Sequence, residues 1–348
     1  MLIINDLHIG TKRQAGTTPA SQAGLREYIY SEFERLLQIE TDHVCVLGDL
    51  FDGFNVETAD VIRTYNLLNN AVARGRRLTL VMGNHDASAK GDKVSSFHLL
   101  AHFLCASSKN VKVVDHSNGL TNVDGNHLDR VFALSHCLNH DLFNLEIAKA
   151  VEMDGEHRVL LLHCNVKNEF AQHSDHSLDL GDEQLGALMR AGWTLVVGHE
   201  HQARTLRSGR VIIPGNQIVT SVADVLGSDK KFYTTITDKV ERHEWLNVPD
   251  IYAEVDWTNL DDAPEKAFLR VTGNATAEQA ADVVAAVAKL RQKSDAYVVG
   301  NAVRIYGMAD FEALAELSFD DVSKVDVLAL LMEELSEREQ DVVRGLLK

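Results

Sequence analysis

The chain has 348 residues, with 51 acidic and 34 basic side chains, and its formal charge of −17 argues against unspecific binding to phosphate backbones through bulk charge. A hydrophobic content of 45% and a charged content of 24% exclude wholesale disorder, and the length allows one large domain or two. No apolar run approaches the roughly 20 residues that cross a bilayer, and the N-terminus lacks a signal-peptide pattern, so we expect a cytoplasmic protein without a membrane segment.

Short apolar runs alternate with longer segments of helical spacing over the first 248 residues. The runs are rich in β-branched and aliphatic residues, as buried strands are, and cover residues 2–5, 44–47, 78–82, 131–134, 159–162 and 194–197. Residues 25–38 and 59–74 carry apolar side chains at helical spacing. The alternation predicts an α/β layered domain over residues 1–248.

The composition changes near residue 249, where we place a domain boundary. The order strand, strand, helix, strand predicts a small α+β domain at residues 249–310; the four segments are 252–257, 267–272, 277–292 and 297–305. Residues 311–348 form a third, acidic segment with helical spacing. Its apolar stripe consists of Val325, Leu328, Leu331, Met332 and Leu335.

Five short motifs carry side chains that can bind metal ions. They are Asp6-Leu7-His8, Gly48-Asp49-Leu50-Phe51-Asp52, Gly83-Asn84-His85-Asp86, a single histidine at His163, and Gly198-His199-Glu200-His201. Any one of them recurs by chance, since a lone D-x-H is more often a helix cap and a lone histidine after a strand is more often a core residue. All five in this order, each at the end of an apolar run, indicate one shared site.

The residue types in these motifs suit two divalent cations. Hydrolysis of a phosphate ester uses such a pair to activate a water and to neutralise charge on the phosphoryl oxygens. A bridging carboxylate with imidazole and oxygen ligands suits manganese, iron or zinc better than calcium. The candidate ligands are Asp6, His8, Asp49, Asn84, His163, His199 and His201. We expect the adjacent glycines, Gly48, Gly83 and Gly198, to let the backbone turn sharply at each strand end.

The ordered set resembles the calcineurin-like metallophosphoesterase superfamily, whose pattern is D-x-H, G-D-x-x-D, G-N-H-[DE], H and G-H-x-H, over residues 1 to about 240. The resemblance implies a layered sandwich of two mixed sheets flanked by helices, and two bound divalent ions. It also implies two ligand sets that share one carboxylate, namely Asp6, His8 and His201 for one ion, Asn84, His163 and His199 for the other, and Asp49 as the bridge.

His85 matches the histidine that protonates the leaving group or stabilises the transition state in that superfamily, and it is not a ligand. A histidine near two cations can act as a general acid at neutral pH if a carboxylate keeps it protonated. Asp52 and Asp86 are the candidates for that partner, and we place Asp52 with His85 in the catalytic set. Asp86 is interpreted equally well as a loop or helix cap.

Details of the motifs resemble SbcD-type DNA nucleases, the bacterial relatives of the archaeal and eukaryotic double-strand-break repair nucleases. The strings Asp6-Leu7-His8-Ile9-Gly10 and Ile213-Pro214-Gly215-Asn216 are similar to that branch, which more often has serine where Asn216 stands. Gly53-Phe54 occupies the place of the Arg-Gly of serine/threonine protein phosphatases, which counts against that class. The resemblance implies an exonuclease of DNA repair or recombination, with single-strand endonuclease activity as a possible addition.

The C-terminal hundred residues resemble the same branch more weakly. SbcD-type nucleases carry a small α+β capping domain beside the active site, and then helices that dock onto the coiled coil of an SMC-like ATPase, SbcC. Residues 249–310 and 311–348 have the order and periodicity for both. Packing of the C-terminal helices on the chain's own core is the alternative, and a homodimer also stays open.

Basic side chains follow several motifs, where they can position a DNA backbone without reading its sequence. The candidate substrate contacts are Lys12, Arg13 and Arg204, together with His136, which can line the groove or be structural. A charged loop is more often simply solvated. Residues 249–348 hold 20 acidic and 10 basic side chains, so −10 of the net charge of −17 lies outside the region of the motifs.

Three functions compete at this point. The leading hypothesis is a DNA phosphodiesterase that uses two divalent ions, with Mn²⁺ as the first choice and Mg²⁺, Fe²⁺ or Zn²⁺ as alternatives. The second is a stand-alone phosphatase or phosphodiesterase for nucleotides or other small phosphoesters. The third is a catalytically weak scaffold subunit, which the intact set of ligands disfavours.

Overall fold

The computed structural model describes residues 1–12, 16–88, 93–123, 130–153, 158–167 and 178–306. These residues form two compact units, one made of residues 1–12 and 19–252 and the other of residues 16–18 and 253–306. The predicted docking segment, residues 311–348, lies outside the described residues, as does Arg13. Within the described ranges, no helix combines the length and the apolar character needed to cross a membrane.

The first sheet of the larger unit has six strands and is mixed. Their spatial order is β14 (Val240–Asn247), β13 (Lys230–Ile236), β1 (Leu2–Ile4), β2 (His43–Leu47), β3 (Arg77–Val81) and β4 (Val111–Val114). Strands β1 to β4 run parallel, with Leu2 opposite Val44 and Val44 opposite Leu78. Strand β13 pairs antiparallel with β1, and β14 pairs antiparallel with β13.

The second sheet also has six strands and is mixed. Its order is β11 (Arg204–Leu206), β12 (Val211–Ile213), β10 (Thr194–Gly198), β7 (Val159–His163), β6 (Val131–Leu134) and β5 (Thr121–Asn122). The four central strands run parallel, and the two edge strands are antiparallel to their neighbours. A separate pair, β8 (Asn165–Val166) and β9 (Asp179–Leu180), follows β7.

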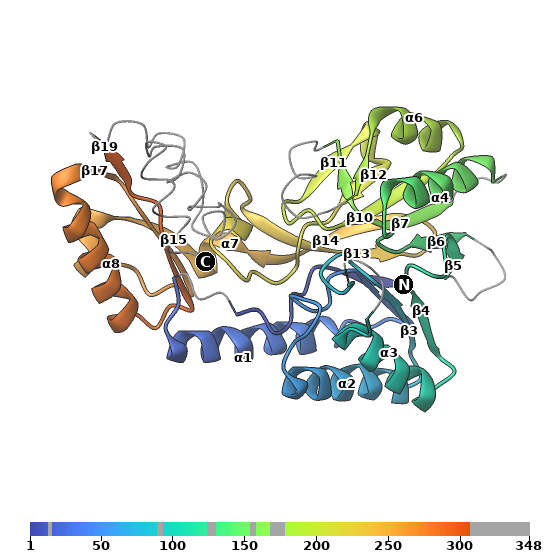
Figure 1. Cartoon of the computed structure of the whole chain (residues 1–348), viewed down its shortest axis with the longest axis horizontal. Coiled ribbons are helices and arrows are strands. Elements are labelled where there is room, and N and C mark those ends of the chain that lie inside the picture. Colours follow the sequence, from blue (N-terminus) through green and yellow to red (C-terminus); the bar gives the residue numbers. More distant parts are fainter. Residues whose placement is uncertain (13–15, 89–92, 124–129, 154–157, 168–177, 307–348) are drawn as a thin grey trace, which may run out of the picture. The chain divides into compact units, whose positions relative to one another are not determined.

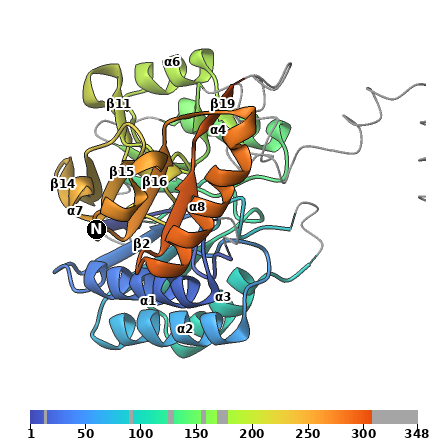
Figure 2. The same cartoon turned by 90° about the vertical axis from the view of Figure 1, so that its left-hand side faces the viewer.

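Helices cover the outer face of each sheet, as Figures 1 and 2 both show. On the first sheet lie α1 (Pro19–Leu36), α2 (Thr58–Ala73) and α3 (Ser96–Ser107), and on the second lie α4 (His140–Glu152) and α6 (Asp182–Arg190). Short helical turns, η1 (Arg207–Gly209), η2 (Ala223–Val225) and α7 (Val248–Ile251), join the later strands. Apolar side chains of both sheets, among them Ile3, Leu47 and Leu161, form the core between them. The predicted α/β sandwich of two mixed sheets flanked by helices is therefore confirmed.

The smaller unit is an α+β fold with a core of its own. Its sheets are β15 (Tyr252–Asp256), β16 (Phe268–Thr272) and β18 (Val298–Asn301), and the pair β17 (Asn274–Thr276) and β19 (Arg304–Tyr306). Its helices are α8 (Ala280–Lys293) and the turns η3 (Trp257–Asp262) and η4 (Ala277–Gln279). Val283 and Val287 of α8 pack against Leu269 and Val299 of the sheet. Its function as a capping domain stays a prediction.

Candidate metal centre

All five motifs lie at the carboxyl ends of parallel strands. Strand β1 leads into Asp6, β2 into Asp49 and β3 into Asn84, while His163 ends β7 and β10 leads into His199. Because the carboxyl ends of parallel strands meet at one edge of a sheet, and the two sheets face each other, the motifs converge on one site.

The loops that carry the candidate ligands have uncommon backbone dihedral angles. Asp6, His8, Asp49 and His199 have positive φ angles of 52°, 47°, 47° and 89°. Asp and His enter this region more readily than most residues, and each instance costs about 1–3 kcal/mol. Hydrogen bonds between the loops offset the cost, for example from the Asp6 N–H to the Gly48 carbonyl (3.2 Å).

The glycines of these motifs allow a very close approach between loops. A Cβ on Gly48 would lie 1.9 Å from Nδ1 of His163, and one on Gly83 would lie 2.1 Å from Oδ1 of Asp49. Gly48 has a φ of 78°, as its predicted function in a sharp turn requires, whereas Gly83 and Gly198 do not have positive φ. At those two positions, glycine is needed because the neighbouring loop leaves no room for a side chain.

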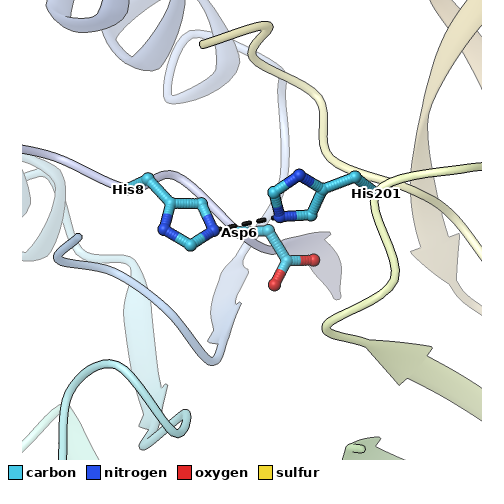
Figure 3. A group of neighbouring side chains, drawn as sticks. All are labelled: Asp6, His8 and His201. Carbon is cyan, nitrogen blue, oxygen red and sulfur yellow. Dashed lines mark hydrogen bonds between the residues drawn. The ribbon is translucent and has the colours of Figure 1, made fainter. Parts of the chain in front are cut away.

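Asp6, His8 and His201 form the first group of candidate ligands (Figure 3), with ligand atoms within 4.8 Å of one another. The rings of His8 and His201 approach through their edges, and their Nε2 atoms are 3.1 Å apart. Nδ1 of His201 is 2.7 Å from Oδ1 of Asp224. Because a carboxylate only accepts, this Nδ1 carries the proton, and the lone pair of Nε2 is directed toward His8.

Asp49, His163 and His199 form the second group, again within 4.8 Å. The amide oxygen of Asn84 lies 3.0 Å from both Nε2 of His163 and Nδ1 of His199. Nδ1 of His163 donates to the carbonyl of Leu47 (3.3 Å), so its Nε2 is the nitrogen available to a cation. All four side chains direct a nitrogen or oxygen atom to one point.

Asp49 lies between the two groups. Its Oδ2 is 3.2 Å from Nε2 of His163 in the second group and 3.9 Å from Nε2 of His8 in the first. The position is the one that a bridging ligand requires. The assignment of the individual ligands stays a prediction, although all seven candidates meet at this edge.

The site fits a pair of divalent cations. Imidazole nitrogens together with carboxylate and amide oxygens form the donor set of such ions, and Asp6, His8, Asp49 and His163 are all nearly inaccessible to solvent. Burial alone would raise the pKa of Asp49, but the charges of His163, His85 and His8 lower it well below the ordinary value. Reciprocally, burial lowers the pKa of His163, and Asp49 outweighs that effect and raises it to about 9. Buried carboxylates of this kind need positive charge beside them.

His85 lies beside both groups, and with His8 and Asp49 it forms a further cluster whose nitrogen and oxygen atoms lie within 4.8 Å of one another. Its ring centroid is 4.9 Å from that of His8, and its main-chain N–H donates to Oδ1 of Asp49 (3.0 Å). Its Nδ1 donates to the main-chain carbonyl of Asp52 (2.8 Å), which leaves Nε2 for a proton transfer. Burial lowers the pKa of His85, but the Asp49 charge and the Asp52 carbonyl raise it by more. The Asp52 carboxylate lies 3.2 Å from Nδ1 of His8, and its charge also raises the pKa of His85.

The contacts of Asp86 fit its interpretation as a loop cap, and its charge also contributes to the raised pKa of His85, so both interpretations stay open. Asp86 is fully buried, and it accepts hydrogen bonds from the N–H groups of Leu50 (3.3 Å), Phe51 (3.0 Å) and Gly83 (3.0 Å). These bonds tie the loop of Asp49 to the loop of Asn84. Burial and the nearby charge of Asp49 raise the pKa of Asp86 to about 7.

Two of the predicted substrate contacts lie in surroundings that differ from each other. Lys12 is exposed, and its ammonium is 3.1 Å from Oε1 of Glu57. His136 is buried, and its main-chain N–H donates to the carbonyl of Met82 (2.9 Å). A function of either residue in substrate binding stays a prediction.

Arg204, the third predicted contact, is engaged in a local network. Its guanidinium donates to both carboxylate oxygens of Glu200 (2.6 and 2.8 Å) and to the carbonyl of Val166 (2.6 Å). Glu200 in turn accepts from the N–H of Val166 (2.8 Å). The network fixes β8 against the loop that carries His199 and His201.

Sequence reasoning missed two buried charged residues at the site, Asp224 and Lys231. Asp224 lies in η2, 23 residues after its partner His201, and no spacing rule connects the two. Lys231 is the second residue of β13, whose alternation is broken by a β-bulge between Lys231 and Phe232. The alternating pattern that would mark an inward-facing lysine is therefore absent.

Among the comparisons with known proteins, the family match agrees with this geometry. A family model described as calcineurin-like phosphoesterase matches residues 1–203. A search of curated proteins finds no match. Among solved structures, phosphopantetheinyl hydrolase from Mycobacterium tuberculosis has a TM-score of 0.40 and 14% identity, covering 64% of this chain and 90% of that one. A cold-active protein-tyrosine phosphatase of a psychrophilic Shewanella species has a TM-score of 0.31 and 15% identity, covering 70% of this chain and 80% of that one.

Proposed function

The chain belongs to the calcineurin-like phosphoesterase family, and from this premise we propose that it cleaves the phosphodiester backbone of DNA as an SbcD-type nuclease. Its general activity, metal-dependent hydrolysis of a phosphoester, follows from the family and from the clustered Asp and His ligands. DNA as the substrate is supported by details of the motifs. These are Gly53-Phe54 in place of an Arg-Gly pair, and Ile213-Pro214-Gly215-Asn216 after the last motif.

One observation carries the hydrolytic part of the proposal, namely that seven candidate ligands from five strand ends converge on one edge. They form two groups, and Asp49 lies within 4 Å of a histidine in each. A set with five imidazole or amide ligands and two carboxylates suits Mn²⁺, which we propose as the working ion.

The chain's own residues position the substrate and move a proton. When bound, a pair of divalent cations supplies Lewis acidity toward the phosphoryl oxygens and a water acidic enough to attack near neutral pH. His85 is held by the Asp52 carbonyl at Nδ1, and its Nε2 can deliver a proton to the departing ribose oxygen. Asp86 keeps the His85 loop at a fixed distance from Asp49, because it binds the N–H groups of both loops.

A substrate panel tests the proposal. Purified chain with Mn²⁺ is given linear duplex DNA, single-stranded DNA and bis(p-nitrophenyl) phosphate, and the panel is repeated with Mg²⁺, Fe²⁺ and Zn²⁺. We expect DNA to be cleaved, with the highest rate in Mn²⁺. Turnover of the small ester alone, with DNA untouched even beside the partner ATPase, would reject the nuclease function.

A small phosphoester is the second candidate substrate, and one observation favours it. Lys12 and Arg204, the described basic residues that were expected to contact DNA, are already paired with Glu57 and Glu200. A small substrate needs no extended basic surface. The same panel separates the two candidates, since only a nuclease shortens the DNA.

We also propose that an SMC-like ATPase is the partner, on the strength of the apolar stripe in residues 311–348. Leu328, Leu331 and Leu335 recur at the spacing of one helix face. Changing all three to serine in the full chain should abolish co-purification with the ATPase and leave Mn²⁺-dependent hydrolysis of the small ester unchanged. Unchanged co-purification would reject this docking surface.

A further inference from the structure

We propose that Asp224 is a positioning residue that holds the ring proton of His201 on Nδ1 and thereby keeps its Nε2 ready for a metal ion. The inference rests on the proposed function of the site, because it takes His201 as a ligand. It concerns a part of the chain beyond the family match, which ends at residue 203. Four observations support it.

The first is the contact between the two side chains. Nδ1 of His201 is 2.7 Å from Oδ1 of Asp224, a short, charge-assisted distance. Figure 3 shows the result, with Nε2 of His201 turned toward His8 at 3.1 Å and the Asp6 carboxylate beside it. A ring with its proton on Nε2 would present an N–H to the cation and could not bind it.

The second observation is that Asp224 itself is fixed. Its side chain is buried, and its Oδ2 accepts from the Thr220 N–H (2.7 Å), the Thr220 hydroxyl (2.9 Å) and the Ser221 N–H (2.8 Å). Three donors on one oxygen leave the other oxygen, Oδ1, directed at His201. The carboxylate is thus held as an acceptor from both sides.

The third observation is a buried ammonium that fixes the main chain of both residues. Nζ of Lys231 donates to the carbonyls of His201 (3.1 Å) and Asp224 (2.5 Å) and to Oδ1 of Asn216 (2.6 Å). An ammonium has three donors, so this set satisfies it completely, as a fully buried charge requires. Lys231 therefore ties the loop of His201 and the turn of Asp224 to strand β13.

The fourth observation is a contrast with His163. The side chain of His163 is fully buried at the end of β7, and its Nδ1 is held by the carbonyl of Leu47. The side chain of His201 is 26% exposed and lies beyond the end of β10. On its loop, the ring of His201 is held by the carboxylate of Asp224, where the ring of His163 is held by a strand carbonyl.

Replacing Asp224 with asparagine tests the inference, because the change keeps the shape of the side chain. The three donors at the Oδ2 position require an oxygen there, so the new NH₂ group faces Nδ1 of His201. That nitrogen must then accept, and the ring proton moves to Nε2. Calorimetric titration of the metal-free chain with Mn²⁺ should show one of two sites weakened about 10- to 100-fold, with the other little changed.

Glu146→Gln is the matched control. Glu146 lies on α4 and accepts from the Leu120 N–H (2.8 Å), away from every candidate ligand. This variant should bind Mn²⁺ as the wild type does. Wild-type affinity at both sites in Asp224→Asn would overturn the inference.

A second measurement needs no variant of Asp224, so it tests the position of the His201 ring proton even if Asp224→Asn does not fold. In the metal-free wild type with ¹⁵N-labelled histidine, nuclear magnetic resonance should show neutral His201 with its proton on Nδ1, assigned by loss of the signal in His201→Gln. A proton on Nε2 would overturn the inference. Neither readout depends on DNA cleavage, so a failed nuclease assay leaves both intact, whereas a wild type that binds no Mn²⁺ would reject the proposed function.

Discussion

The two edges of the paired sheets of the larger unit differ in what they hold. The carboxyl ends of the parallel strands carry the candidate metal centre, with buried carboxylates and positive φ angles at Asp6, His8, Asp49 and His199. The amino ends surround a cavity of about 600 Å³, which none of the candidate ligands lines. His43, at the start of β2, is buried there, and its Nε2 is 2.8 Å from the Thr79 hydroxyl.

The two edges differ in the charge of the side chains that they bury. Burial and the positive charges of Arg77 and of the chain's N-terminus lower the pKa of His43 to about 3, so its ring is neutral at physiological pH. The carboxyl edge instead buries ionised groups that a pair of cations can stabilise. We therefore expect changes at the carboxyl edge to alter metal binding and rate, and changes at the amino edge to alter stability.

Asp49→Asn should give the largest effect. It removes the carboxylate that lies between the two ligand groups, so neither cation keeps its full set of ligands. The rate should fall by more than the roughly 10²- to 10³-fold that one lost hydrogen-bond donor costs an active site. Metal content by mass spectrometry and the initial rate of ester hydrolysis measure it. Two bound equivalents with an unchanged rate would show that Asp49 does not bridge.

His85→Ala should give the second-largest loss of rate. This variant separates catalysis from metal binding at the same edge. Loss of a general acid lowers the rate about 10²- to 10⁴-fold. The metal content should stay at two equivalents, because the ring of His85 is held by the Asp52 carbonyl and is not needed as a ligand. A variant that loses metal along with its activity would make His85 a ligand and contradict its assigned function.

At the amino edge, we expect the largest effect in the pH dependence of the free energy of unfolding. The folded chain holds the pKa of His43 near 3, below an unfolded value of about 6.5, so only the unfolded state takes up the proton as the pH falls. The contribution of His43 to the free energy of unfolding is therefore fully present above pH 6.5 and is lost as the pH falls toward 3. Between pH 7 and pH 5 the loss should be about 2 kcal/mol.

Urea unfolding of the metal-free wild type and of His43→Gln at both pH values measures this loss. Other titrating groups contribute equally to both proteins, so the difference between their pH slopes isolates His43. Hydrolysis at pH 7.5 should be unchanged in the variant, because His43 is remote from the ligands. Equal pH slopes for the two proteins would mean that His43 is protonated in the folded state as readily as in the unfolded one.

Lys12→Ala should give the smallest effect. Its ion pair with Glu57 is exposed on both sides, so its loss should change the free energy of unfolding little. If Lys12 contacts a DNA phosphate, the slope of log affinity against log salt concentration should fall by about one unit, with the same loss for every DNA sequence. Fluorescence anisotropy with labelled duplex measures the slope. An unchanged slope would show that Glu57 retains Lys12 and that the phosphates lie elsewhere.

The six strands predicted from apolar runs coincide with β1, β2, β3, β6, β7 and β10 to within one residue at each end. They were predictable because a buried parallel strand is a short continuous apolar run, and polar site residues begin where it ends. The antiparallel strand β13 was not predicted, since it mixes Lys231, Thr234 and Thr235 with apolar residues and contains a bulge. Helix α3 was also missed, although the Ser95 hydroxyl caps it at the His98 N–H.

The site followed the same rule. Residues in compact motifs at strand ends, such as Asp6 and His199, could be grouped as candidate ligands from the sequence, and the structure brings them together. Partners that meet them only through tertiary contact, such as Asp224 and Lys231, were not predicted, because nothing local distinguishes them from surface residues. The main-chain contact of His85 had the same limit, since a hydrogen bond to the carbonyl of Asp52 cannot be read from the sequence.

The most direct test of the two-cation centre is a stepwise Mn²⁺ titration of the metal-free wild type, with heat and hydrolysis of bis(p-nitrophenyl) phosphate followed in parallel. We expect two equivalents to bind, and the rate to rise only as the second site fills, because both ligand groups share Asp49. Hydrolysis that is complete at one equivalent, or that persists in excess chelator with no metal bound, would contradict the account.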